Sequence, residues 1–372
     1  MTVDGLYSAE LYDSLKGTVE KISTKQKNGK TVMDFTLYYH DSLLIKLTPH
    51  VGDCLMDAKK AAQSVTLLTT PPRAAYTLDE PNALLLDTAE LKLDDEDWRP
   101  NEELLRADTA IRQQLKYDVW GASHCQPWCM ENKDDVHRVQ LRFAFESEIK
   151  LSGAKLAAEL TDDAIILLDG KQISNKPVGY YVDRDIRTYA LPELAAGSHT
   201  LEITMDYDTH SSLEWCYILG DFGVYNAGRY NIITKLPEKL GFTDITKQFL
   251  PFYSGKLTYH VPVTTDAEQV RVRIPQYRAA AVLVGANDGE RKQVSLAPFT
   301  AVLNTQKGEN TIHIDAYISR TNGFGPVHLA DRAMPYVSPA GWRTKNDSWT
   351  YEYMLQEEGL CSSPIIEALE KN

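Results

Sequence analysis

The chain has 372 residues and a formal net charge of −13, from 39 Lys and Arg residues against 52 Asp and Glu residues. A chain of this length suggests two or three domains. Hydrophobic residues make up 43% of it, which is enough to form packed cores and excludes wholesale disorder. The acidic balance argues against a nucleic-acid-binding protein, which normally carries a basic face.

Five cysteines form a sparse and odd-numbered set that does not make a disulfide framework. The first fifteen residues lack the basic start and apolar run of a secretory signal. No stretch approaches the ~20 apolar residues of a membrane span. We therefore expect a cytoplasmic chain without a membrane partner, although the start of a fragment would say nothing about targeting.

Residues 1–70 contain only a few strand-like runs, at 31–39 and 42–47, after a hairpin signal at Asn28 and Gly29. A brief turn of helix is expected at 59–64. Because isolated hairpins are marginally stable, we expect this part to be a partial β segment, the remnant or edge of a preceding domain.

Residues 71–228 begin at a Pro-Pro pair and contain strand-like runs at 138–145, 164–168 and 200–205. An amphipathic helix is predicted over about 100–117, because Pro100 suits the first helical position. Its first turn carries two acidic residues, and one face carries four apolar residues: Glu102 and Glu103, then Leu104, Ala107, Ile111 and Leu115.

Residues 229–360 contain a second set of strand-like runs, including 269–274, 281–284 and 311–317. The turns at Asp169-Gly170 and Asp288-Gly289 occupy similar places in the two sets, which suggests two copies of one architecture. Residues 361–372 are expected to form a tail, with a short helix near 365–370.

Strand-like runs separated by turn residues are typical of antiparallel sandwiches and not of βαβ units. We therefore predict a mostly β chain with two consecutive antiparallel jelly-roll sandwiches, at 71–228 and 229–360. One short amphipathic helix and the small N-terminal β segment complete it. Nothing matches the eight βα repeats of a parallel barrel.

Four segments of the sequence resemble segments of a known group of proteins. GENTIHI at 308–314 follows a hairpin signal and resembles the sugar-binding jelly roll of glycoside hydrolase family 2. LPFYSGKLTYH at 250–260, RTNGFGPVHL at 320–329 and EWCYILGDFGV at 214–224 resemble strands of such galactose-binding-like domains in large bacterial glycosidases, including α-L-rhamnosidase-like proteins. The resemblance covers about residues 75–355. It implies that a catalytic barrel, if there is one, lies upstream.

A sugar offers an apolar face and a fringe of hydroxyls, which an aromatic plane and convergent polar groups can bind. The chain has 6 Trp and 20 Tyr to supply such planes. The first hypothesis is a non-catalytic carbohydrate-associated module that binds a glycan or braces a catalytic domain. Its candidate binding residues lie in two loops: Asn322, Phe324, His328, Trp342 and Arg343.

Two alternatives remain open. A glycoside hydrolase acting on its own would need two carboxylates about 5–10 Å apart, and Glu214 and Glu148 are the candidates. A structural spacer without a ligand is the other alternative. Turnover of nitrophenyl glycosides separates the hydrolase from the binding module, and a glycan screen separates the binding module from the spacer.

We expect no cofactor, apart from a candidate structural calcium ion. A transition-metal site at His124, Cys125, Cys129 and His137 is disfavoured, because the second compact ligand pair of a structural zinc site is missing. Calcium prefers carboxylate and carbonyl oxygens, which sandwich loops often supply. The candidate ligands are five aspartates: Asp79, Asp87, Asp162, Asp163 and Asp221.

Overall fold

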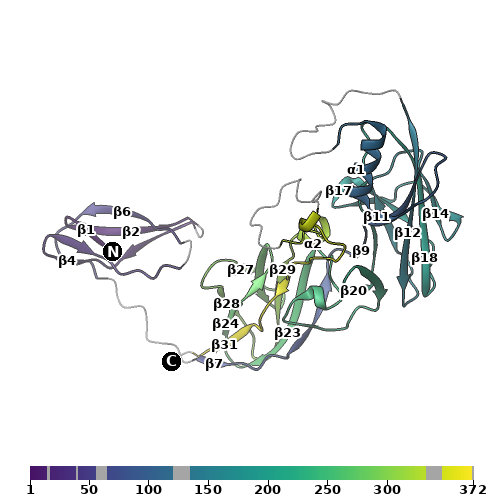
Figure 1. The fold of residues 1–372 in the computed structure, drawn as a ribbon. Helices are drawn as coiled ribbons and strands as arrows, with labels where there is room; N and C mark the ends of the chain where they lie inside the picture. Colours follow the sequence, from purple (N-terminus) through teal and green to yellow (C-terminus); the bar gives the residue numbers. More distant parts are fainter. Residues whose placement is uncertain (15–16, 39–40, 56–64, 120–134, 332–345, 371–372) are drawn as a thin grey trace.

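The structure is a computed structural model that describes residues 1–14, 17–38, 41–55, 65–119, 135–331 and 346–370 (Figure 1). The regular structure of the described part is mostly β-strands in antiparallel sheets, with one parallel pair between β12 and β21. The predicted mostly β fold of antiparallel sandwiches is confirmed. Neither α-helix in these ranges is long and apolar enough to cross a membrane.

The N-terminal unit consists of two three-stranded sheets with orders β1-β5-β4 and β3-β2-β6. Asn28 and Gly29 join β4 to β5 with φ angles of 53° and 72°, the left-handed conformation that a tight hairpin turn requires. Its buried apolar residues in the described ranges are Ala9 and Met33, so its core is small. The strands are β1 Thr2–Asp4, β2 Tyr7–Asp13, β3 Thr18–Ile22, β4 Lys25–Lys27, β5 Lys30–Val32 and β6 Leu44–Pro49.

The first sandwich packs a large sheet, with order β11-β10-β12-β18-β14-β15, against a second sheet, β16-β17-β13-β19-β9. The hairpin β20–β21 joins the large sheet through β12. Alternate residues of β12 and β18 are buried, because successive side chains of a strand point to opposite faces. The strands are β9 Asn82–Leu86, β10 Thr88–Leu93, β11 Arg99–Glu103, β12 His137–Ser147, β13 Lys155–Ala158, β14 Ile165–Leu168, β15 Lys171–Gln172, β16 Gly179–Tyr181, β17 Asp183–Ala190, β18 Gly197–Tyr207, β19 Cys216–Gly220, β20 Gly223–Ala227 and β21 Tyr230–Thr234.

The second sandwich packs the sheet β22-β8-β23-β29-β26-β27 against the sheet β28-β24-β31-β7 around a separate core. A short pair, β25 and β30, lies beside them. The strands are β7 Val65–Leu67, β8 Arg73–Leu78, β22 Leu240–Gly241, β23 Lys256–Thr265, β24 Gln269–Arg273, β25 Tyr277–Arg278, β26 Ala281–Ala286, β27 Lys292–Gln293, β28 Thr300–Asn304, β29 Gly308–Tyr317, β30 Gly359–Leu360 and β31 Ile365–Leu369.

The predicted helix is shorter than expected. Residues from Arg99 to Glu103 form β11, so Pro100 lies in a strand and not at a helix start. Helix α1 (Leu104–Leu115) begins at Glu103, whose carboxylate accepts hydrogen bonds from the backbone N–H groups of Leu105 and Arg106. The predicted apolar face is confirmed, because Leu104, Ala107 and Ile111 are buried and Leu115 packs against the core of the first sandwich.

The remaining helices are short: α2 (Thr321–Phe324), η2 (Ile245–Lys247) and η3 (Asn346–Ser348). The helix expected near 365–370 is wrong, because this segment is strand β31, paired with β24 and β7. The helix turn expected at 59–64 lies outside the described residues.

The sheets do not divide where the chain was expected to divide. Strand β7 lies before residue 70, and β8 lies at the start of the segment assigned to the first sandwich, yet both belong to the second sandwich. Strand β31 places the expected tail in the same sandwich. The segment 319–331 follows β29, and its Phe324 and Val327 pack against the core of the first sandwich.

Candidate functional site

The loop around α2 holds three of the predicted sugar-binding residues, and all three are well packed. The amide of Asn322 donates to the carbonyl of Gln356 at 2.8 Å and accepts from its N–H at 2.9 Å. Phe324 packs between the rings of Tyr181 and Tyr217, with ring centres 5.6 and 5.3 Å away. Asn322 and Phe324 thus fasten this loop to the rest of the protein and present little surface to a ligand.

His328 belongs to a buried polar group beside the first sandwich. Its Nε2 lies 2.8 Å from Oδ2 of Asp87, whose other oxygen accepts a 2.6 Å hydrogen bond from the hydroxyl of Tyr353. Burial alone would lower the pKa of His328, but the hydrogen bond and the charge of Asp87 raise it above its ordinary value. The pair joins the loop after β9 to the loop after α2.

A second buried carboxylate, Glu103, lies close enough to interact electrostatically with Asp87. Glu103 caps α1 and accepts a 2.8 Å hydrogen bond from the indole N–H of Trp215. Its burial, and to a lesser extent the charge of Asp87, raise its pKa to about 7, although three N–H donors oppose this shift. Two buried acids, Asp87 and Glu103, thus lie close to the imidazole of His328 in this part of the protein.

An open hollow of about 610 Å³ lies on the outer face of the large sheet of the first sandwich. Strands β10 and β12 form its base, and the hairpin β20–β21 and the segment 351–353 contribute its rim. We call it the tyrosine hollow. Its polar and aromatic lining comes from residues Asp87, Glu90, Asn101, Arg142, Arg229, Tyr230, Asn231, Tyr351 and Tyr353.

Two tyrosines of the tyrosine hollow present their rings to solvent. Tyr230, at the tip of the β20–β21 hairpin, is 61% exposed, and Tyr351 is 43% exposed. The hydroxyl of Tyr351 donates to the carboxylate of Glu102, 3.2 Å from each oxygen. Its ring meets that of Trp349 edge to face at 4.3 Å, so the position of the ring is set before any ligand arrives.

The charged lining of the hollow is partly fixed as well. Arg142 forms ion pairs with Glu90 at 3.2 Å and with Glu202 at 3.5 Å, and its guanidinium lies 3.9 Å from the ring centre of Trp98. Arg229 is exposed and lies 5.2 Å from the ring centre of Tyr230. The hollow therefore combines aromatic planes with donors and acceptors, the combination that suits a sugar.

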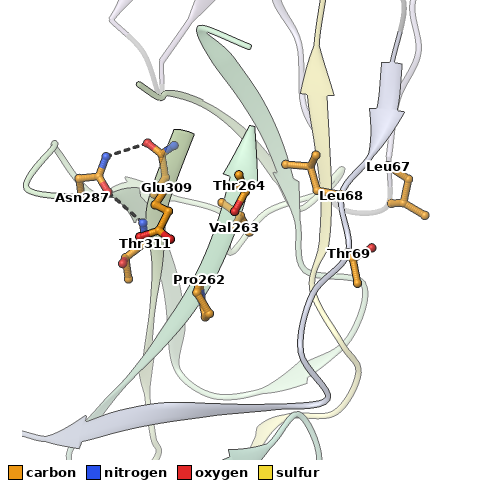
Figure 2. A pocket seen from close by; sticks show the side chains of 10 residues that line it. Leu67, Leu68, Thr69, Pro262, Val263, Thr264, Asn287, Glu309 and Thr311 are labelled. Atoms are coloured by element: carbon orange, nitrogen blue, oxygen red, sulfur yellow. Dashed lines mark hydrogen bonds between the residues drawn. The ribbon is translucent and has the colours of Figure 1, made fainter. Parts of the chain in front are cut away.

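A second hollow, of about 720 Å³, lies at one end of the second sandwich (Figure 2). Figure 2 shows Asn287 hydrogen-bonded to its neighbours, with its side chain 2.9 Å from the side chain of Asn310 and from the N–H of Thr311. Among the residues that the structure describes, its lining contains no aromatic ring, and Glu309 is its one titratable side chain. Although it is the larger of the two, it lacks the planes that a sugar ring would stack on.

The two predicted catalytic residues, Glu148 and Glu214, lie apart from the tyrosine hollow. Glu148 follows β12 and is exposed, and Glu214 precedes β19 and is partly buried; neither lines either hollow. Trp342 and Arg343 lie outside the described residues. So do His124, Cys125 and Cys129 of the disfavoured metal site, whose fourth member, His137, hydrogen-bonds to Asp94.

The five aspartates proposed for calcium do not gather at one place. Asp79, Asp162 and Asp163 face Lys256, Arg187 and Arg138 respectively. Asp87 binds His328, and Asp221 is exposed. Within the described ranges, no three His, Cys, Asp or Glu side chains come close enough together to hold a metal ion.

Comparison with known proteins gives no family. No family model matches the sequence, and no curated protein matches it. Among solved structures, a glycoside hydrolase family 2 β-galacturonidase from Eisenbergiella tayi bound to galacturonate is similar over 65% of this chain and 37% of its own, with 9% identity and a TM-score of 0.24.

Two rhamnosidases give TM-scores that are equally low. The enzyme from Novosphingobium sp. PP1Y matches over 69% of this chain and 26% of its own, with 12% identity and a TM-score of 0.25. The α-L-rhamnosidase from Streptomyces avermitilis complexed with L-rhamnose matches over 98% and 35%, with 12% identity and a TM-score of 0.23. The chain thus spans about a third of these structures. Scores this low place it in no family, and we derive nothing about function from them.

Proposed function

We propose that the protein binds carbohydrate in the tyrosine hollow. The observation that carries this proposal is the pairing of two exposed tyrosines, Tyr230 and Tyr351, with charged and amide side chains around one concave surface. A volume of this size is in the range of small-molecule sites, about 300–1,000 Å³. The sequence resemblance to sugar-binding jelly rolls supports the same ligand class.

The chemistry favours binding over hydrolysis at this place. The hollow contains two carboxyl groups, Asp87 and Glu90, but each is already engaged. Asp87 is 1% exposed and bonds to His328 and Tyr353, and Glu90 is paired with Arg142. A glycosidase needs one carboxyl group that can donate a proton and one that can attack or activate water. Groups held this way suit the orientation of sugar hydroxyls.

A glycan array of the whole protein, followed by calorimetric titration of the best ligand, tests the proposal. Tyr351→Ala and Tyr230→Ala should each weaken binding about tenfold, because a stacking ring contributes on the order of 1 kcal/mol beyond its buried area. Tyr180→Ala is the matched control, since this ring is 60% exposed but lies on β16 in the opposite sheet.

The hydrolase alternative has its own measurement. Turnover of nitrophenyl glycosides that disappears in both Glu148→Gln and Glu214→Gln would replace the binding proposal with a catalytic one. Equal binding by wild type, Tyr351→Ala and Tyr230→Ala would instead remove the tyrosine hollow as the site. A protein that binds no glycan on the array would leave the structural spacer as the function.

A further inference from the structure

Two histidines face each other across the central strand pair of the second sandwich. His260 on β23 lies directly opposite His313 on β29, and their Nδ1 atoms are 2.9 Å apart. The rings are nearly perpendicular, at 85°. The strand neighbours Tyr259 and Ile312 are completely buried, so the alternation of side chains directs both imidazoles to the outer, partly exposed face of the sheet.

The hydrogen bonds around the pair are compatible with one arrangement of protons that leaves a ring nitrogen of His260 as an acceptor. The hydroxyl of Thr77 lies 3.2 Å from Nε2 of His260. When His260 holds its proton on Nε2 and donates it to Thr77, its Nδ1 has a free lone pair that accepts the Nδ1–H of His313. The lone pair of His260 is thus aimed at its neighbour by a second hydrogen bond, the arrangement that commonly orients metal-ligating histidines.

We propose that His260 and His313 form a two-imidazole site for a divalent first-row transition metal ion on this face. With metal–nitrogen bonds of about 2.0–2.1 Å, nitrogens 2.9 Å apart subtend an angle of about 90° at the metal. That is the angle between neighbouring ligands in the tetragonal sites that Cu²⁺ and Ni²⁺ prefer, whereas a tetrahedral ion would spread the two nitrogens further. The ion takes the place of the Nδ1 proton of His313, which moves through water to Nε2 of the same ring, so that both imidazoles stay neutral.

The charges around the pair are compatible with a cation. Asp315 and Arg291 lie on the same face and form an ion pair at 3.1 Å, so their charges largely offset each other. Burial, and then the charge of Arg291, lower the pKa of His313, and burial also lowers that of His260. The neutral ring is the form of imidazole that binds metals.

The remaining coordination positions would be filled by water. In the described ranges no third His, Cys, Asp or Glu side chain completes a cluster with the pair. A site with two protein ligands exchanges its metal readily, so we expect reversible binding and not a permanently held structural ion. Binding should weaken as the pH falls, because protons compete with the metal ion for both imidazoles.

Calorimetric titration of the whole protein with NiCl₂ at pH 7.5, in a buffer that does not chelate metals, tests this site. Wild type should bind one more Ni²⁺ ion than either His260→Asn or His313→Asn. Thr77→Val should weaken the affinity for this additional Ni²⁺ ion about tenfold, because it removes the hydrogen bond that orients His260. His210→Asn is the control, an exposed single histidine whose loss should leave the titration unchanged.

The two variants share all other histidines and cysteines of the chain, so any background binding cancels in the comparison. Far-UV circular dichroism and urea unfolding confirm that each variant is folded. Equal Ni²⁺ stoichiometry in wild type and both variants would overturn the proposal. Loss in only one of the two variants would also overturn it, since the site needs both rings.

Discussion

Glu103→Gln gives a test of the buried acids, because its effect on the free energy of unfolding should grow as the pH rises. Glu103 is 1% exposed, and its pKa in the folded protein is about 7 against 4.5 as an ordinary glutamate. Between these two pH values the folded state holds a proton that the unfolded state has released. The free energy of unfolding therefore falls as the pH rises through this window.

The size of the fall follows from the two pKa values. The difference between about 7 and 4.5 corresponds to about 3 kcal/mol of stability, present below pH 4.5 and lost by about pH 7.5. Glutamine resembles the protonated acid in shape and charge. Glu103→Gln should therefore be more stable than wild type by about 1 kcal/mol or less at pH 5 and by about 3 kcal/mol at pH 8.

Urea unfolding of both proteins at pH 5, 6, 7 and 8, followed by tryptophan fluorescence and circular dichroism, measures this difference. His328 has a raised pKa, so its own contribution is complete below its unfolded pKa of about 6.5 and is lost as the pH rises through its folded pKa. The charge of Glu103 is one of the causes of that raised pKa, so this contribution should be smaller in Glu103→Gln. The reasoning is refuted if Glu103→Gln is less stable than wild type at pH 8. In that case the hydrogen bonds from Leu105, Arg106 and Trp215 would stabilise the ionised carboxylate of Glu103 more than burial destabilises it.

Three further changes test the packing around the sites. Arg112→Met should destabilise the first sandwich by about 3–5 kcal/mol in urea unfolding, because it leaves the completely buried Asp108 without its ion pair; a loss below 1 kcal/mol would contradict this. Asn322→Ala should cost about 1–3 kcal/mol by removing both hydrogen bonds to Gln356, while glycan affinity changes less than twofold. Gly170→Ala should cost about 1 kcal/mol, measured as a lower thermal midpoint, because φ is +74° there; an unchanged midpoint would contradict the turn.

Local patterns predicted the elements that depend on local physics. The alternation at 138–145 and 200–205 appears as β12 and β18, and the turn at Asp169 and Gly170 joins β14 to β15. Helix α1 was predicted too long at its start, because the signal of Pro100 was weighed as a helix start. The conformation of Pro100 is set instead by the pairing of β11 with the large sheet. An edge strand such as β11 tolerates a proline.

Pairings between distant segments could not be predicted in this way. Strand β31 was expected to be helical. Its short apolar run fits a helix as well as a strand, and only its pairing with β24 makes it a strand. Strands β7 and β8 join partners far along the chain, so the expected boundaries near residues 70 and 228 do not follow the sheets. Nothing in their own residues identifies those partners.

In the candidate site, too, local sequence identified single residues but not the contacts between distant segments. His328 was selected for its loop, and the structure adds the partner Asp87 that explains its burial. Tyr230 and Tyr351 were missed, because the hollow is assembled from segments that are more than a hundred residues apart in sequence. The one local signal was the row Arg229, Tyr230 and Asn231 after a glycine turn, which places an aromatic ring beside two polar groups.

The position of a bound sugar is the most direct test of the central claim. A crystal structure of the protein with the strongest ligand from the glycan array should show a sugar ring against Tyr230 or Tyr351, with its hydroxyls toward Arg229 or Arg142. Sugar density in the hollow beside Asn287 and Glu309, or on any surface away from the two tyrosines, would contradict the account.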